Sequence, residues 1–276
     1  MEPVSLQEFK TIIWDYYRVF GRSFDWRNID DPYKVFISEV MLQQTQTSRV
    51  AQKYPQFILE FPSFESLSAA SLKAVLTQWQ GLGYNRRGLY LHRAAQDIIQ
   101  NFMGRLPNDP TQLEKLPGIG KATAASITAF AFNTPTIFIE TNIRTVFIHF
   151  FFTDQKIVQD KEIIPLLEDS LDKENPREWY YALMDYGVML KKSFKNPSRK
   201  SAHHIIQSKF EGSDRQIRGK ILKLLTLSSA SFTIQDIIDL INKDKGRVEK
   251  IVKQMAQEKI IVVQNQELYI CESKDY

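Results

Sequence analysis

The chain has 276 residues, of which 43% are hydrophobic and 12% aromatic, and this composition excludes a disordered polypeptide. Its length fits either one large domain or two smaller ones. The 36 Lys and Arg residues against 32 Asp and Glu residues give a net charge of +4, which permits a nucleic-acid partner without requiring one.

Cysteine content and hydropathy exclude two further classes of protein. The single cysteine, Cys271, excludes an intramolecular disulfide framework and any metal site built on several thiolates. No apolar run is long enough to cross a bilayer, and the N-terminus lacks a signal-peptide core. We therefore expect a soluble, cytoplasmic protein without a membrane partner.

Apolar residues at helical spacing dominate the first 190 positions. Leu6, Phe9, Ile13 and Tyr17 begin the pattern, and Asp31-Pro32 predicts the start of the next helix. Glycine and proline are expected between the helices rather than inside them. The further predicted helices are 47–60, 71–79, 86–102, 111–116, 120–132, 140–151, 160–171 and 176–191.

The composition changes near residue 196. Prolines, serines and basic residues interrupt the periodicity and predict a linker or irregular coil over 196–212. Three short helices (216–227, 234–242 and 247–257) and two strands (260–263 and 268–271) follow, which is the order of a winged-helix domain spanning 213–276. On the third helix, Arg247 and Lys250 face away from the apolar stripe. They are either DNA contacts or an ordinary solvated face, and the sequence leaves both open.

A Leu-Pro-Gly-x-Gly segment joins two of the predicted helices. The first helix stops at Pro117, and a helix rich in small residues starts near Gly120. Unpaired amides and the helix dipole at such a start favour an anion, and Lys121 adds a positive charge. We interpret the segment as a helix-hairpin-helix DNA clamp rather than an ordinary helical corner. The expected DNA contacts here are Leu116, Gly118, Ile119, Gly120 and Lys121.

Two glutamates are candidate catalytic carboxylates. Glu39 lies on a helix beside Val35 and Phe36, where desolvation would raise the pKa of a carboxyl group and let it hold a proton for general acid catalysis. From periodicity alone, a surface glutamate is the simpler interpretation. Glu140 follows an apolar run at a predicted helix start, where it is either a capping group or a carboxylate that stabilises positive charge on a sugar.

Four segments in this order resemble the catalytic module of MutY-type adenine DNA glycosylases, in the helix-hairpin-helix superfamily that includes endonuclease III. The resemblance covers roughly residues 5–195. The segments are Ser38–Gln46, Gly81–Tyr84 with Asn85–Ala95 after it, Leu116–Lys121 and Ala182–Gly187.

The resemblance implies a mainly α, two-lobed glycosylase module over 1–195. A six-helix lobe would span about 30–136, and a second lobe would combine 1–29 with 137–195. The winged-helix-like domain would follow this module.

The resemblance also implies an activity: hydrolysis of the N-glycosidic bond of a flipped-out, mispaired adenine in double-stranded DNA, by a monomer. Glu39 matches the glutamate that protonates adenine, and Asn142 matches an asparagine that supports the second carboxylate. Gln44 matches the glutamine that is wedged into the base stack. Gln43 and Thr45 flank it, Tyr84 stands beside the Gly81–Gly83 turn, and all three are expected at the DNA. The hairpin of this superfamily often binds a monovalent cation as well.

Two departures from the family pattern affect the chemistry. Glu140 stands where the family has an aspartate, so its carboxylate is displaced by one methylene. Ala122 stands where bifunctional relatives have a Schiff-base lysine, which predicts a monofunctional enzyme that leaves the abasic strand intact.

Two further departures affect cofactor and partner recognition. The positions of the family's iron–sulfur cysteines hold Lys191, Ser198, Ser201 and Gln207, so we expect no cluster and no other cofactor. The winged-helix-like segment replaces the family's usual C-terminal domain, so the sequence does not determine which base stands opposite the target adenine. Two alternatives remain: a glycosylase of this fold for another mismatched or damaged base, and a catalytically weak DNA-binding protein.

Overall fold

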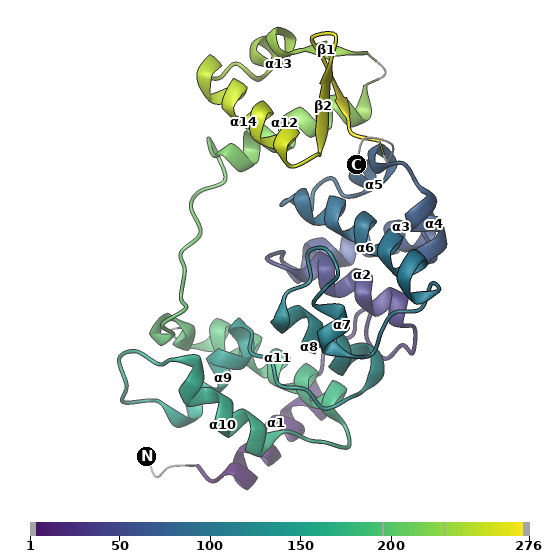
Figure 1. The fold of residues 1–276 in the computed structure, drawn as a ribbon. Helices are drawn as coiled ribbons and strands as arrows, with labels where there is room; N and C mark the ends of the chain where they lie inside the picture. The colour runs from purple at the N-terminus through teal and green to yellow at the C-terminus, as the bar shows by residue number, and fades with distance from the viewer. Residues whose placement is uncertain (1–3, 195, 229, 273–276) are drawn as a thin grey trace. The chain divides into compact units, whose positions relative to one another are not determined.

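Helices make up most of the computed structural model, which describes residues 4–194, 196–228 and 230–272 (Figure 1). The chain divides into two compact units. The first comprises Met1–Phe36, Asn108–Lys115 and Ile119–Ile206, and the second comprises Ile37–Pro107, Leu116–Gly118 and Gln207–Tyr276. Helix α2 (Pro32–Leu42) runs from the first unit into the second.

The first unit packs α1 (Leu6–Phe20) and α9 (Thr141–Phe151) against α11 (Pro176–Ser193). A capping box between Ser5 and Glu8 starts α1, and the buried Phe9 ring lies 5.2 Å from that of Phe147 on α9. The remaining elements of this unit are α7 (Pro110–Leu113), α8 (Lys121–Phe132), α10 (Asp160–Ser170) and the short 3₁₀ helix η1 (Pro197–Lys200).

The second unit begins with helices that pack around the buried Trp79 and Phe57. Helix α6 contacts both α4 and α5. The bounds are α3 (Thr47–Glu60), α4 (Phe64–Ala69), α5 (Leu72–Gln78) and α6 (Arg86–Phe102).

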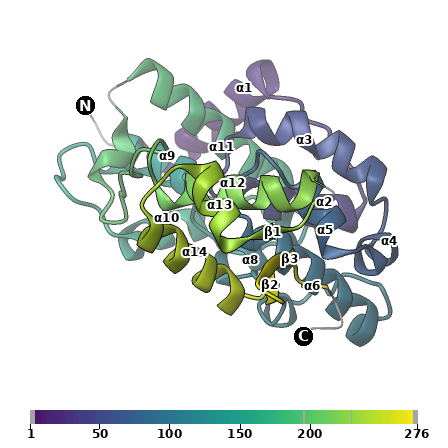
Figure 2. The ribbon, with the colours of Figure 1, turned by 90° about the horizontal axis from the view of Figure 1, so that it is seen from above.

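The C-terminal part of the second unit has the predicted order of three helices and a hairpin. A short strand, β1 (Phe232–Thr233), adds to the hairpin in an antiparallel sheet of order β1-β3-β2, and Asn265 and Gln266 take positive φ in its turn. The other elements are α12 (Asp214–Leu227), α13 (Ile234–Ile241), α14 (Lys245–Gln257), β2 (Ile261–Gln264) and β3 (Glu267–Ile270), seen from above in Figure 2.

The hydrophobic core of this C-terminal part is continuous with residues of the helices before it. Ile217, Ile221 and Leu222 of α12 belong to one buried cluster with Leu72 and Leu76 of α5, and α12 contacts α5 directly. The three helices and the sheet are therefore packed onto the helices that precede them in the second unit.

The expectation that proline and glycine lie between the helices was wrong. Pro55 lies inside α3 and Pro165 inside α10, and Gly88 and Gly187 lie inside α6 and α11. Helix α4 was not predicted, because its six residues are too few to show a helical period. Gly88 has a packing reason, since a Cβ on it would meet Trp79 at 3.0 Å.

Candidate active site and DNA-binding elements

The first candidate acid lies near the end of α2. Ser38 and Val40 on either side of it are buried, whereas Glu39 itself is partly exposed. A carboxyl group in this position is accessible to a ligand and yet stands among buried neighbours. The position suits a general acid on a rigid element.

Helix α2 ends in a turn that carries the predicted glutamines. Gln44 is exposed and takes a left-handed conformation with φ of 51°, which a non-glycine residue adopts at a cost. The Gln43 side-chain amide donates to the backbone carbonyl of Gly118 at 3.3 Å. The structure thus brings Gln43 and Gly118 of the hairpin into contact within the second unit.

Arg87 on α6 holds this turn in place. Its guanidinium donates to the carbonyls of Val40 (2.8 Å) and Met41 (2.9 Å) at the end of α2, and to the Thr45 hydroxyl (2.7 Å). Two longer bonds of 3.2 Å reach the carbonyls of Leu82 and Gly83. Burial lowers the pKa of Arg87 to about 10. The Arg87 guanidinium therefore satisfies carbonyls at the end of α2 that lack a helical partner, and it links the turn at Thr45 to the loop at Leu82 and Gly83.

Sequence reasoning missed Arg87 as a functional residue. It lies within the Asn85–Ala95 segment that carried the family resemblance, but nothing in its spacing distinguishes it from the neighbouring Arg86. The role of Arg87 as a donor to the carbonyls at the end of α2 follows only from the packing of α6 against that helix end.

The loop before α6 carries Tyr84 in a left-handed conformation with φ of 45°, between the glycine turn and α6. Gly81 (φ of 92°) and Gly83 (φ of 72°) provide backbone angles that other residues resist. The Tyr84 hydroxyl accepts a hydrogen bond from Arg215 of α12 at 3.2 Å and one from the Gln207 amide. The predicted DNA-facing tyrosine is thus linked to the C-terminal part of its own unit.

The helix-hairpin-helix segment has the conformation expected of a clamp. Gly118 takes φ of 78°, and a Cβ there would meet Tyr90 at 2.8 Å, so only glycine fits. Gly120 is the N-cap of α8 without any side-chain cap, and Lys121 is exposed beside it. Leu116 and Ile119 are buried, so they support the hairpin rather than offering their whole side chains to a ligand.

The second candidate carboxylate lies in the first unit and caps α9. Glu140 accepts from the backbone amides of Asn142 (2.7 Å) and Ile143 (3.0 Å), and from the Asn142 side-chain amide (3.3 Å). The Lys191 ammonium of α11 in turn donates to the Asn142 side-chain oxygen at 2.7 Å. The predicted pair of Glu140 and Asn142 is therefore assembled, with Lys191 as a third member.

Burial and charge act in opposite directions on this group. Burial raises the pKa of Glu140, and the nearby Lys191 ammonium and the two amides of α9 lower it. Burial likewise lowers the pKa of Lys191, and the Glu140 carboxylate raises it. Burial has the larger effect, so the pKa of Glu140 lies above its ordinary value. The capping bonds and the ammonium act against burial and favour the ionised form, which is the form that can stabilise a developing cation.

Asp185, in the fourth family-like segment, anchors the first unit. Its buried carboxylate accepts two bonds of 2.9 Å from Arg27 and one of 2.7 Å from the backbone amide of Arg22. The Arg27 guanidinium also lies 4.2 Å from the centroid of the Tyr181 ring. The conspicuous Met-Asp-x-Gly motif thus has a structural role.

The donors at the positions of the family's cluster cysteines do not fit an iron–sulfur cluster. None is a thiolate, Lys191 is hydrogen-bonded to Asn142, and Ser198 donates to the Asn196 side chain at 2.8 Å. The Gln207 side-chain amide donates a hydrogen bond to the Tyr84 hydroxyl. Among residues 4–194, 196–228 and 230–272, no group of three or more His, Cys, Asp and Glu side chains is arranged to hold a metal ion.

The two basic residues predicted at the DNA on α14 differ in their surroundings. Arg247 is paired with Asp214 at 2.6 Å and donates to the Gly212 carbonyl at 2.7 Å, so its guanidinium is used within the protein. Lys250 is exposed. Arg247 fastens the start of α14 to that of α12.

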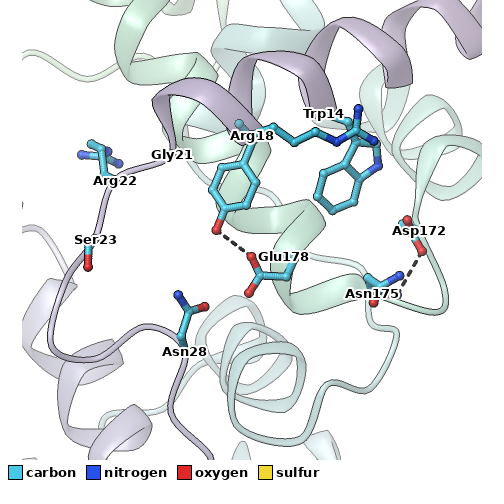
Figure 3. Close-up of a pocket in the computed structure, with 10 residues that line it drawn as sticks. Trp14, Arg18, Gly21, Arg22, Ser23, Asn28, Asp172, Asn175 and Glu178 are labelled. Carbon is cyan, nitrogen blue, oxygen red and sulfur yellow. Dashed lines mark hydrogen bonds between the residues drawn. The ribbon is translucent and has the colours of Figure 1, made fainter.

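A separate pocket of about 630 Å³ opens in the first unit between α1 and the start of α11 (Figure 3). Its charged groups are already engaged within the fold: Tyr17 donates to Glu178 at 2.6 Å, Arg18 pairs with Asp15 and Arg22 with Asp185. None of the predicted site residues lines it. We regard the pocket as a surface feature of the helix packing.

The hairpin, the buried α8 and the order of the surrounding helices are features of a known repair fold. A family model described as "HhH-GPD superfamily base excision DNA repair protein" matches residues 37–172. This match covers just under half of the chain. The predicted fold class, a mainly α helix-hairpin-helix glycosylase fold with a small C-terminal helical and sheet segment, is confirmed.

Similar sequences in this superfamily are adenine DNA glycosylases. The protein from Buchnera aphidicola subsp. Baizongia pistaciae is 36% identical over 66% of this chain and 52% of its own length. The protein from Homo sapiens is 31% identical over 56% of this chain and 29% of its own length. The chain therefore spans about half the length of the bacterial relatives it matches.

Solved structures show the same fold. A thermostable thymine-DNA glycosylase has a TM-score of 0.61 at 23% identity, covering 70% of this chain and 90% of its own. A trapped endonuclease III–DNA covalent intermediate has a TM-score of 0.56 at 19% identity, covering 67% of this chain and 87% of its own. Among the described residues, no helix combines the length and the apolar character needed to cross a membrane.

Proposed function

We propose that this chain is a monofunctional adenine DNA glycosylase, which hydrolyses the N-glycosidic bond of a mispaired adenine flipped out of double-stranded DNA. Extraction of the base is required because the bond is inaccessible in a stacked duplex. The enzyme acts as a monomer, beside the DNA in the cytoplasm, and leaves the abasic strand intact.

One observation supports the proposal most directly. Within the second unit, the partly exposed Glu39 lies on α2, and the turn with the exposed Gln44 follows this helix directly. The Gln43 side chain in the same turn donates a hydrogen bond to the backbone carbonyl of Gly118 in the hairpin. An acid, a side chain able to enter the base stack and the Leu116–Gly118 part of the hairpin thus lie in the second unit. This is the set of parts that base extraction followed by hydrolysis needs.

Each carboxylate has its own role in this proposal. Glu39 protonates the adenine so that it becomes a leaving group, and then positions water. Glu140, ionised and held by the amides of α9, stabilises the positive charge that develops on the sugar. Asn142 orients Glu140. Glu39 and Glu140 belong to different units of the chain.

Neither lyase nor redox chemistry is part of the proposal. Ala122 offers no amine for a Schiff base, so strand scission by that route is excluded. We propose that the enzyme carries no iron–sulfur cluster, since its donor set does not fit one. A monovalent cation at the hairpin would bind backbone carbonyls beside the phosphates.

The test uses labelled duplexes with adenine opposite guanine or 8-oxoguanine, followed by alkaline cleavage of abasic sites. We expect product only after alkali, and we expect Glu39→Gln to lower the single-turnover rate by at least about 100-fold. Glu60→Gln, on the exposed end of α3, is the matched control. Equal rates for Glu39→Gln and the wild type would refute the assignment of the acid.

A second candidate keeps the fold and changes the base. It is favoured by Glu140, whose extra methylene alters the site where the family has an aspartate. Duplexes with uracil, thymine or alkylated purines in place of adenine test it: faster release of any of these bases would replace adenine as the substrate.

A further inference from the structure

A groove of about 460 Å³ lies within the second unit, beside the Gln44 turn. The Gln44 turn and the loop from Gly81 to Asn85 form one wall, and α12 of the C-terminal part forms the other. Glu39 does not line it. Its volume is in the range of small-molecule and cofactor pockets, which is enough for a nucleotide.

The charge of the groove is positive. Arg49, Arg215 and Lys223 line it, and among its described lining residues there is no Asp or Glu. Within the described part of the chain, none of these three cations pairs with a carboxylate. Three uncompensated cations along one groove favour phosphate groups.

The groove also offers surfaces for a base. The Tyr84 ring lies 5.7 Å from the Arg215 guanidinium, and Phe210 lines the groove with 57% of its surface exposed. Aromatic faces of this kind bind unstacked bases irrespective of sequence. Side-chain amides, including that of the exposed Gln44, provide donors and acceptors for base edges.

Helix α12 leaves room for such a ligand. Gly219 lines the groove from the middle of α12, and a Cβ built on it would meet nothing within 4 Å. The helix itself is fixed by the buried Ile217, Ile221 and Leu225, none of which lines the groove. The wall is therefore rigid, and one position of it lacks a side chain.

We propose that this groove binds an unstacked DNA nucleotide with its flanking phosphates, and that α12 is the DNA-contacting helix of the C-terminal part. Arg215 and Lys223 contact the phosphates, and Tyr84 and Phe210 contact the base. Helix α14, the usual groove-reading helix of a winged-helix order, plays no part here, because Arg247 is used by Asp214 and Gly212. The inference rests on the proposed binding of DNA.

The test measures binding of the full chain to a fluorescent duplex with one tetrahydrofuran abasic-site analogue, as a function of salt. The double variant with Arg215→Gln and Lys223→Gln should bind the duplex about tenfold more weakly or worse. The slope of log binding constant against log salt concentration should fall in magnitude by about 2. The matched control is Lys220→Gln with Lys250→Gln, which removes two exposed cations outside the groove. It should leave both quantities close to those of the wild type.

Gly219→Leu tests the groove without changing charge. The added side chain fills the groove and should weaken binding by a similar factor, with an unchanged or raised Tm, because glycine is a poor helix residue. Gly246→Leu, on α14 and outside the groove, is its control. If both groove variants bind as tightly as the wild type, the inference is wrong.

Photocrosslinking from 5-iododeoxyuridine, placed in either strand next to the analogue, identifies which strand occupies the groove. A crosslink to Tyr84 or Phe210 from either strand supports the proposal, and crosslinks from neither strand refute it. Adenine excision by the same proteins separates the two proposals. Weakened binding in the groove variants, without any excision by the wild type, would refute the adenine activity and retain the groove.

Discussion

Asp185 is a buried carboxylate between two arginines of the first unit. Asp185 and Arg27 are both almost fully buried, with side-chain exposures of 1% and 4%. Hydrogen bonds and charge from Arg27 and Arg22 lower the pKa of Asp185 against the opposing effect of burial. Removing one partner would leave the other charge buried without compensation.

We therefore expect Asp185→Asn to destabilise the protein by at least about 3 kcal/mol, because Arg27 loses its only buried charge partner among the described residues. Urea or thermal unfolding measures the change. Asp15→Asn is the control, since its pair with Arg18 is exposed by 61% and 70% and should contribute less than about 1 kcal/mol. Similar losses in the two variants would contradict the argument.

Lys191 provides a second test at single residues, and this test rests on the proposed activity. Lys191→Met removes the ammonium that lowers the pKa of Glu140 and orients Asn142. Since Glu140 acts ionised, its raised pKa should move the acid limb of the excision profile to higher pH. Displacement of the carboxylate should also slow single-turnover excision, by about 10- to 100-fold.

The controls for this test separate positioning from folding. Binding to the abasic analogue should be unchanged in Lys191→Met, and Lys191→Arg should restore part of the rate. Lys192→Met, at the exposed neighbouring position, should behave as the wild type does. A slower rate with an unmoved acid limb would show that Lys191 does not act through Glu140.

At the scale of elements, the close approach of α9 and α11 determines the geometry of Glu140. Gly187 makes this approach possible, since a Cβ there would meet the Asn142 carbonyl oxygen at 2.5 Å. The glycine of the fourth family-like segment therefore faces the start of α9. Gly187 lies within the helix, so its conformational freedom is not needed there. What the position requires is the absence of a side chain.

Gly187→Ala should destabilise the protein by about 1–3 kcal/mol, because overpacking outweighs the better helix propensity of alanine. Gly219→Ala, where a Cβ meets nothing within 4 Å, should instead stabilise it by up to about 1 kcal/mol. Thermal unfolding of both variants measures the contrast. A shift of the same sign in the two would contradict the close approach of α11 to Asn142.

The order of most helices could be predicted from hydrophobic periodicity and helix-capping residues. Helices α3 and α6 have the predicted bounds, and the hairpin of β2 and β3 follows its polar turn closely. Interior prolines and glycines were wrongly excluded from helices, because propensity describes an isolated helix and packing overrides it. Arg87 and Lys191 were not predicted in their roles, since both act on elements that are distant in sequence.

At the scale of the whole chain, a buried histidine links stability to pH. His92 is fully buried on α6, and its Nε2 lies 3.0 Å from the Ala70 carbonyl oxygen. Burial lowers the pKa of His92 below its ordinary value near 6.5. The unfolded chain therefore binds a proton at a higher pH than the folded protein does.

Stability should be fully present above about pH 6.5 and should fall as the pH drops towards the lowered pKa of His92. Thermal unfolding between pH 8 and pH 5.5 should show this decline, and His92→Gln should reduce its slope. His204→Gln, at an exposed position, should leave the slope unchanged. An identical slope in the wild type and His92→Gln would refute the linkage.

The sequence by itself determined the helices, the glycine hairpin, the family resemblance and the departures at Glu140, Ala122 and the cluster positions, because these depend on local pattern and residue identity. Only the tertiary structure decided which side chains act together. It placed Arg87 at the end of α2, Lys191 beside Asn142 and α12 opposite the Gln44 turn. Such contacts join residues far apart in the chain, and their geometry comes from packing around shared cores, which no local pattern encodes.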